Sequence, residues 1–176
     1  KKMNPPDGIP YKLLTYPYGE YVLSGSSVGV WVAAIDKSYG KAEITEPIYY
    51  SVESDNTTVG QAVINNDGYA TLYGDGDVYF SAVTGEAYGS TMLHSVSNPD
   101  SIVIKNESDG SEVSSLSVSS GQTVYLTADS VYQNINLTDS DEAYSWSVSD
   151  ENLGTISADG TFIPGNVSGT GTINVS

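Results

Sequence analysis

The chain has 176 residues and a formal net charge of −16, and its six basic residues are all lysines. Nucleic acids and anionic membrane surfaces bind proteins through clusters of lysine and arginine, so this composition argues against both as partners. Cysteine is absent, which excludes disulfides, thiol catalysis and cysteine-bound zinc. No apolar run approaches the length of a membrane-spanning helix, so no membrane insertion is expected.

The first half of the chain has the pattern of short strands. Residues 1–10 contain three prolines and are expected to form an extended leader or linker. Residues 11–15 are predicted to be an edge strand, because Pro17 cannot donate a hydrogen bond to a neighbouring strand. In residues 28–34 valine alternates with other residues, which predicts a strand whose valines face the core while Trp31 points the other way. Further strands are expected at 21–23, 48–52, 59–64, 69–72, 78–83 and 91–96.

The second half continues the pattern after a short, proline-containing junction at residues 97–100. In residues 144–148 tyrosine, tryptophan and valine alternate with serine, which is the period of a strand with one buried face. The pair Asp159-Gly160 predicts a tight hairpin turn, because glycine tolerates positive φ. Residues 138–142 are interpreted as a charged loop. The other strands are expected at 102–105, 124–128, 131–137, 153–156 and 169–175.

The two halves repeat one another. Residues 50–56 (YSVESDN) match residues 146–152 (WSVSDEN), and the pair Asp67-Gly68 matches the later Asp-Gly pair. The spacings are about 92 to 96 residues, which is the size of one immunoglobulin-type sandwich. The sequence therefore predicts an all-β chain of two tandem immunoglobulin-like antiparallel sandwiches, at residues 11–97 and 98–176.

The repeat also predicts the core. Trp146 is expected to lie between the two sheets of the second sandwich as its large central residue, and Tyr50 stands at the same position in the first. The strand and turn patterns place three aliphatic side chains close to the tryptophan, namely Val124, Leu126 and Ile156.

Residues 146–150, 154–160 and 169–173 (WSVSD, GTISADG and GTGTI) resemble the core signature of bacterial Ig-like domains of the invasin and intimin type. Residues 121–128 (GQTVYLTA) are similar to that family's opening, a glycine before an alternating strand. The first half departs from the signature, because it lacks the tryptophan and lengthens the segment before Gly68. The resemblance implies a module of an exported bacterial protein, extracellular or on the cell surface, with no shared active site.

The paired arrangement is also similar to the domains that follow the catalytic domain of secreted bacterial phosphodiester glycosidases. That resemblance implies an accessory region next to a hydrolase, with residues 5–10 as the exit from the catalytic domain. A strand at 91–96 follows the strand at 78–83 in the first half, whereas the second half stops at the equivalent of the earlier one. The second sandwich is therefore expected to be truncated, without its last strand and with an open sheet edge.

Few side chains suggest chemistry. His94 is the sole histidine and lies in a predicted strand without the context of a catalytic triad, so it is interpreted as a structural residue. The sequence around Gly74 is interpreted as a hairpin turn and not as a phosphate cradle, because no helix follows it. No metal or cofactor is expected, since no segment has the calcium-loop pattern and solvated loop acids are the default interpretation. The weak candidates for oxygen ligands to Ca²⁺ are Asp75, Asp77, Asp139 and Asp141.

Aromatic residues are the remaining candidates, with fourteen tyrosines and two tryptophans. Rings on a sheet face stack on sugars, which makes Trp31, Tyr39 and Tyr49 candidate ligand-binding residues. Tyrosine also fills half-buried strand positions in any β-rich protein, which is the favoured interpretation. The predicted function is a non-catalytic spacer or accessory module that supports a neighbouring hydrolase domain, with the rest of the parent polypeptide as its partner. The alternative is a carbohydrate-binding or adhesin module with a cell-wall or glycan ligand.

Overall fold

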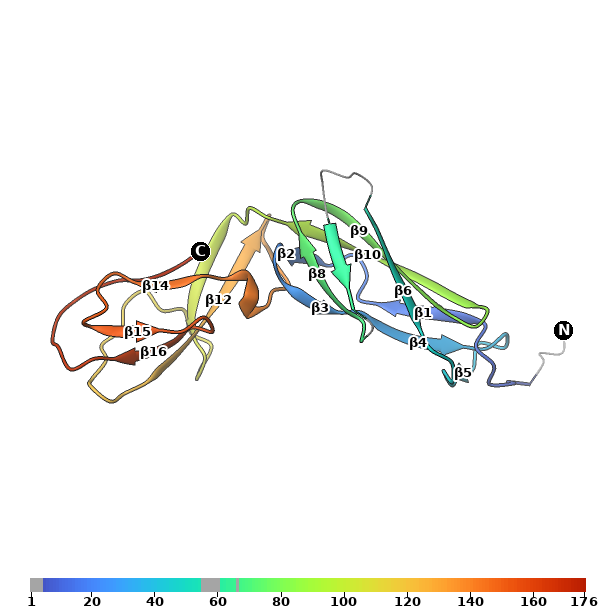
Figure 1. The fold of residues 1–176 in the computed structure, drawn as a ribbon, viewed down its shortest axis with the longest axis horizontal. Coiled ribbons are helices and arrows are strands. Elements are labelled where there is room, and N and C mark those ends of the chain that lie inside the picture. Colours follow the sequence, from blue (N-terminus) through green and yellow to red (C-terminus); the bar gives the residue numbers. More distant parts are fainter. Residues whose placement is uncertain (1–4, 55–60, 66) are drawn as a thin grey trace. The chain divides into compact units, whose positions relative to one another are not determined.

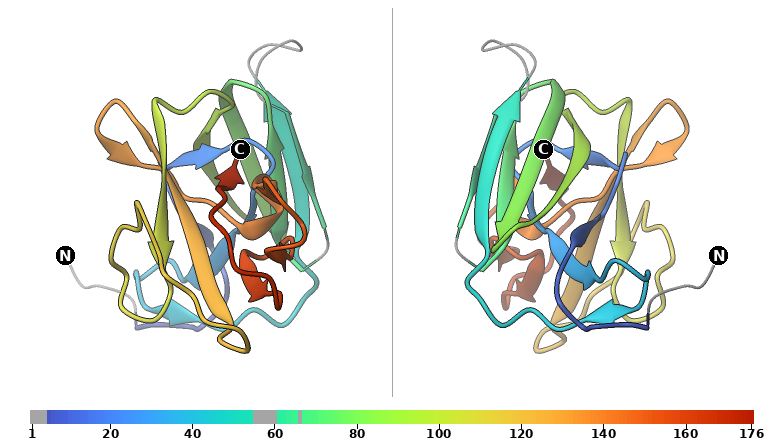
Figure 2. Two further views of the ribbon diagram at one scale, coloured as in Figure 1. Left: turned by 90° about the vertical axis from the view of Figure 1, so that its left-hand side faces the viewer. Right: turned by 90° about the vertical axis from the view of Figure 1, so that its right-hand side faces the viewer.

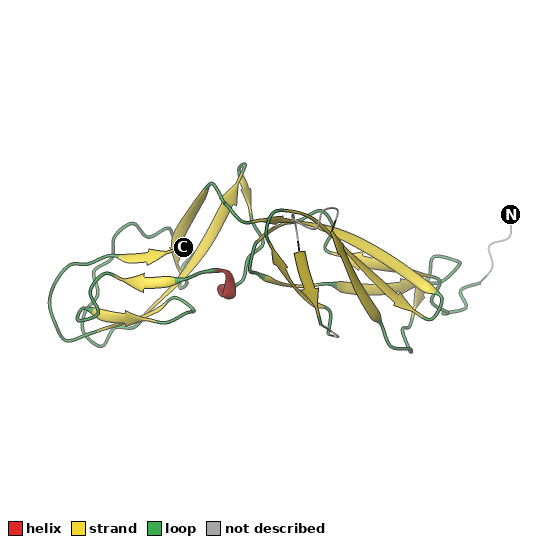
Figure 3. Cartoon of the chain, turned by 45° about the horizontal axis from the view of Figure 1, so that its top comes forward, coloured by secondary structure: helices red, strands yellow, loops and turns green. Residues whose placement is uncertain are grey.

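The computed structural model describes residues 5–54, 61–65 and 67–176 (Figure 1). The chain divides into two compact units: unit 1 runs from Lys1 to Ser97, and unit 2 runs from Asn98 to Ser176. Within the described ranges the sole helix is a single 3-10 turn, and none has the length and apolarity to cross a membrane (Figure 3). The prediction of the fold class is confirmed, because the described chain is all-β, with antiparallel sheets of the Ig-like sandwich type.

The larger sheet of unit 1 has seven strands in its described part, ordered β5-β4-β1-β10-β9-β6, with β2 also pairing with β10. Its strands are β1 (Lys12–Tyr16), β2 (Tyr21–Leu23), β4 (Trp31–Ile35), β5 (Lys41–Ala42), β6 (Tyr49–Ser54), β9 (Gly76–Thr84) and β10 (Ala87–Val96). The second sheet has the order β3-β8-β7, with β3 (Ser27–Gly29), β8 (Tyr69–Tyr73) and β7 (Gln61–Ile64).

The core of unit 1 forms where alternate side chains of these strands point inward. Val78, Phe80 and Leu93 from the larger sheet cluster with Leu72 from β8. Phe80 is 1% exposed and is the largest of the fully buried side chains. Tyr50 is half-buried at the margin of a neighbouring cluster, and burial raises the pKa of its hydroxyl. The large central aromatic residue of unit 1 is therefore Phe80, which the sequence repeat does not single out.

Two local predictions for unit 1 are wrong. Strand β1 is not an edge strand, since it pairs with β4 on one side and β10 on the other. Pro17 lies just beyond its end, where the missing donor costs the sheet no hydrogen bond. The turn at Gly74 is not a hairpin, because it joins β8 of the smaller sheet to β9 of the larger one. The hairpin lies one strand later, at the turn between Thr84 and Ala87.

Unit 2 has a five-stranded sheet in the order β11-β12-β16-β15, with β13 pairing with β12, and a separate pair formed by β14 and β17. The strands are β11 (Ser101–Asn106), β12 (Val124–Tyr132), β13 (Ile135–Asn136), β14 (Trp146–Val148), β15 (Gly154–Ile156), β16 (Thr161–Pro164) and β17 (Ile173–Val175). The segment interpreted as a charged loop continues into the 3-10 turn η1 (Asp141–Ala143), whose first turn carries two acidic residues.

The core of unit 2 is centred on Val124, Leu126 and Phe162, which are nearly inaccessible to solvent. Trp146 packs against this cluster and is half-buried. The β15–β16 hairpin closes next to it at Gly160, which has φ of 85°. A Cβ atom there would collide with the carbonyl oxygen of Leu126, so both the dihedral and the close approach require glycine.

Strand β17 supplies the last described pairing of the chain. Trp146 pairs with Val175 in register, and Ser145 and Ser176 exchange two backbone hydrogen bonds beyond it. Among the pairings of described residues, β17 has β14 as its partner, and β11 pairs with β12 instead. That a further strand completes this edge stays a prediction.

Candidate binding surfaces

The outer face of the larger sheet of unit 1 presents two parallel rows of side chains across β10, β9 and β6, which lie side by side (Figure 2). The register places one tyrosine, one valine and another tyrosine opposite each other in the first row, and three serines opposite each other in the second. We name these two rows the tyrosine–serine patch, which consists of Tyr49, Ser51, Ser81, Val83, Tyr88 and Ser90.

The rings of this patch are open to solvent. Tyr49 is 69% exposed and Tyr88 is 54% exposed. The hydroxyls of Ser81 and Tyr88 lie 3.3 Å apart and share a hydrogen bond. Hydrogen bonds from Ser81 and Ser90 lower the pKa of the Tyr88 hydroxyl. The arrangement is an uncharged surface with aromatic rings and hydroxyl groups next to each other.

The three aromatic candidates from the sequence do not form one site. Trp31 is 71% exposed on the outer face of β4, where it pairs with Tyr16 of β1. Tyr49 lies on β6, four strands away in the same sheet, at about 4.8 Å per strand. Tyr39 lies in the turn between β4 and β5, with φ of 64°. Only Tyr49 belongs to the tyrosine–serine patch.

The sequence analysis missed Tyr79 and Tyr88, which also lie on this outer face. Tyr79 opposes Met92, one row beyond the serines. Both tyrosines alternate with buried residues in their strands, so the period of two predicts their outward direction. Their place next to Tyr49 depends on the order of the strands, which no local pattern specifies.

Two of the candidate carboxylates, Asp75 and Asp77, are engaged by neighbouring protein groups. Asp75 accepts hydrogen bonds from the side chain and backbone of Ser97, which lower its pKa. Asp77 is hydrogen-bonded to Nδ1 of His94, whose ring stacks on Tyr21. Asp141 lies in the first turn of η1. In the described part of the chain, no three acidic or histidine side chains gather as a metal site would require.

Asp139 belongs to a buried polar cluster in unit 2. The hydroxyl of Tyr144 donates to Asp139 and lies 2.8 Å from the hydroxyl of Ser130. Ser130 is fully buried and Tyr144 nearly so. Burial raises the pKa of both Asp139 and Tyr144, and the contact between them raises that of Tyr144 further. The cluster links β12 to the segment that precedes β14, so its hydrogen bonds hold the fold of unit 2 together.

A second buried carboxylate, Asp36, holds a turn in unit 1. It is 1% exposed and accepts backbone hydrogen bonds from Gly8, Ser38 and Gly40. Burial alone would raise its pKa, but these donors together lower it. The bond from Gly8 attaches the leader to the turn between β4 and β5.

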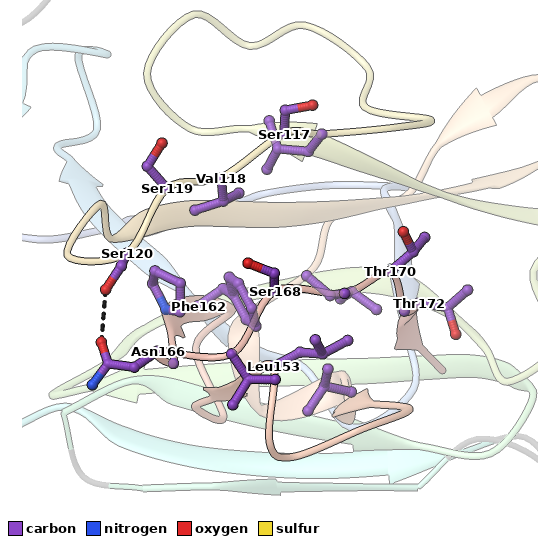
Figure 4. Close-up of a pocket in the computed structure, with 18 residues that line it drawn as sticks. Ser117, Val118, Ser119, Ser120, Leu153, Phe162, Asn166, Ser168, Thr170 and Thr172 are labelled. Carbon is purple, nitrogen blue, oxygen red and sulfur yellow. Dashed lines mark hydrogen bonds between the residues drawn. The ribbon is translucent and has the colours of Figure 1, made fainter.

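Unit 2 has an open groove of about 650 Å³ between the loop before β12 and the loop before β17 (Figure 4). Leu153 and Phe162 lie along it, and the hydroxyl of Ser120 donates to Asn166 across one end. Serines, threonines, glycines and further aliphatic side chains make up most of the remaining lining, which contains no acid, base or cation. A hydroxyl needs a neighbouring base to become a nucleophile. Because the lining contains no base, its serine and threonine hydroxyls are not activated.

No protein-family model matches the chain, and no curated protein matches it. Similar solved structures include domains 4–9 of the surface layer protein SbsC, with 19% identity and a TM-score of 0.43 over 95% of this chain. Domains 5–6 of SbsC show 16% identity and a TM-score of 0.45 over 95% of this chain and 90% of theirs. Invasin, a bacterial integrin-binding protein, shows 15% identity and a TM-score of 0.30 over 92% of this chain. The chain spans 29% of the first of these structures and 35% of invasin.

Proposed function

We propose that this chain is a non-catalytic Ig-like spacer of an exported bacterial protein, extracellular or on the cell surface. It carries a neighbouring domain and transmits tension between that domain and its attachment. The resemblance to accessory regions of secreted phosphodiester glycosidases makes a hydrolase the neighbour. A net charge of −16 suits this setting, because it keeps adjacent copies apart.

The observation that carries the proposal is the pairing of the first and last strands of unit 1. Strands β1 and β2 both run parallel to β10, so the opening segment follows the closing strand. Between these pairings, Gly19 donates to the carbonyl of Met92 at 2.6 Å, and His94 donates to Glu20 at 2.8 Å. Backbone pairing therefore joins the two segments at Tyr88 and again from Met92 to Val96.

This geometry places tension along the strands. Lys12 pairs with Tyr88 and Leu23 pairs with Val96, so the chain enters and leaves at opposite ends of the closing strand. The eight residue-to-residue steps from 88 to 96 span about 26 Å at strand rise. Pulling on the two ends shears the segments past each other, and several hydrogen bonds must then break together. Pulling apart the same ends of two strands breaks them one at a time.

Force spectroscopy with two attachment geometries tests the proposal. Because the chain has no cysteine, paired thiol handles can be introduced at chosen positions. One variant carries Tyr11→Cys and Asn98→Cys, which shears β1 and β2 along β10. The matched control carries Tyr11→Cys and Glu86→Cys, which peels β1 from the start of β10.

The shear geometry is expected to unfold unit 1 at a clearly higher force than the peeling geometry at the same pulling speed. The unfolding rate under force reports the height of the unfolding barrier. That barrier differs between the two geometries, because hydrogen bonds break together in shear and one at a time in peeling. Equal unfolding forces would contradict a load-bearing role for this pairing.

A further inference from the structure

We propose that unit 1 also binds a neutral polysaccharide, and that the tyrosine–serine patch is the binding surface. This function is separate from carrying tension, since the patch lies on the outer face of the sheet and the load-bearing pairing lies in its backbone. Two exposed rings flank Val83 in one row, and three serines form the adjacent row.

The patch differs from the rest of the chain in charge. None of the six residues of the patch is charged, although the chain as a whole carries −16. The nearest charged neighbours in the register stand outside it: Glu53 one row further along β6, and Lys12 beside Tyr88. The patch offers no charged group with which a partner could form an ion pair, whereas an uncharged ligand does not need one.

The hydroxyl content of the patch favours a polysaccharide over a second copy of the chain as its occupant. Five of the six side chains of the patch end in a hydroxyl. The inner face of the same strands carries Val78, Phe80 and Ala82 instead, as a face that packs on another sheet should. Two copies packed through this face would bury the hydroxyls, and each buried hydroxyl then needs a partner.

A polysaccharide satisfies both kinds of group. Its C–H faces stack on aromatic rings, and its own hydroxyls donate to and accept from serine and tyrosine. The strands lie about 4.8 Å apart, so a sugar chain crossing them meets one serine hydroxyl per strand. The Tyr88 hydroxyl is already oriented by its hydrogen bond with Ser81. Strands paired in fixed register hold these side chains in a largely preorganised arrangement, which lowers the entropy lost on binding.

Sedimentation of the 176-residue chain with insoluble chitin, cellulose and β-1,3-glucan provides the test, with polygalacturonate as an anionic comparison. The informative variant carries Tyr49→Ser and Tyr88→Ser, which removes both rings and keeps hydroxyls. The matched control is Tyr125→Ser on β12 of unit 2, because Tyr125 is 54% exposed, as Tyr88 is. Circular dichroism checks that each variant keeps its fold.

We expect binding to at least one of the neutral polysaccharides, largely independent of salt. The double variant should raise the dissociation constant by about tenfold or more, as the loss of aromatic anchors does, while the control binds like the parent chain. No binding to any neutral polysaccharide would overturn the proposal, as would equal losses in variant and control or a preference for polygalacturonate. A dimer in sedimentation velocity that the double variant abolishes would assign the face to a second copy instead.

Discussion

Units 1 and 2 are both β-sandwiches, but they differ in which side chains they bury. In unit 1 several apolar side chains reach 0% exposure, Val22, Leu72 and Leu93 among them, and Phe80 is the large aromatic residue that is fully buried among its described residues. In unit 2 the most buried apolar residue is Leu126 at 2%, and a polar residue, Ser130, is the one at 0%. Unit 1 therefore combines a larger apolar core with buried polar residues at separate places, Asp36 among them, whereas the smaller core of unit 2 adjoins the cluster of Ser130, Tyr144 and Asp139. The two units should respond differently to substitution and to pH.

The largest effect is expected from Phe80→Ala in unit 1. The substitution leaves a cavity among Val78, Leu72 and Leu93 and should cost about 4 kcal/mol. In calorimetry the transition of unit 1 should fall by roughly 15 °C or more while that of unit 2 stays in place. Tyr79→Ala, one residue earlier on the outer face, is the control and should shift it far less. Movement of both transitions together would show that the units do not melt separately.

Trp146→Ala is the corresponding change in unit 2. The indole packs against Val124, Leu126 and Phe162 but is only half-buried, so the cost should be about 3 kcal/mol. Trp31→Ala in unit 1 is the matched control, because Trp31 is 71% exposed and its loss should change stability by roughly 0.5 kcal/mol at most. The two indoles should also differ in fluorescence, with Trp31 quenched more strongly by iodide. If Trp146→Ala melts like the parent chain, this residue does not hold the unit together.

The sequence predicts the features of this fold that depend on neighbouring residues better than those that depend on contacts between distant segments. The turns at Gly68 and Gly160 have φ of 80° and 85°, and both were predicted from Asp-Gly pairs, whose preference is local. The direction of Trp31 was predicted by alternation, which is local as well. The central place of β1 was not, because the partners of a strand depend on contacts with distant segments.

The same division applies to the candidate binding surface. Alternation assigns Tyr49 and Tyr88 to exposed positions, but it does not say that their strands are separated by β9 alone. Composition directed attention to Trp31 and Tyr39, which prove to be distant from Tyr49 in the sheet or outside its face. The patch becomes visible only with the order and register of the strands.

A smaller effect is expected from Tyr144→Phe, which tests the polar cluster of unit 2. The substitution keeps the ring but removes the hydroxyl that serves Ser130 and Asp139. Ser130, which is fully buried, and Asp139, which is half-buried, then each lose a hydrogen-bond partner, which should cost about 1 to 3 kcal/mol. Tyr125→Phe removes an exposed hydroxyl from the same unit and should leave the melting temperature of unit 2 unchanged. Equal melting of both variants would mean that the cluster adds no stability.

The smallest effect concerns the pH dependence of that cluster. Burial raises the pKa of Asp139, so the folded unit keeps this proton to higher pH than the unfolded chain does. Above the unfolded value of 3.8 the folded state therefore binds more protons, and the contribution of Asp139 to stability falls as pH rises through its folded pKa. Asp139→Asn keeps an oxygen that accepts from Tyr144 and does not titrate. The variant should gain stability relative to the parent chain as pH rises from 4 to 7, measured as the difference in the melting temperature of unit 2.

Asp36→Asn in unit 1 provides the comparison, because the pKa of Asp36 is shifted in the opposite direction from that of Asp139. Backbone donors, Gly40 first among them, outweigh burial and lower the pKa of Asp36. Its ionised form therefore stabilises unit 1 above the unfolded value of 3.8, and this contribution is lost as pH falls through the lower folded pKa. Asp36→Asn should thus destabilise unit 1 at pH 7, and the gap should close below pH 3.8. If the two variants show gaps of the same sign, or gaps that do not depend on pH, the two carboxylates do not differ as their surroundings imply.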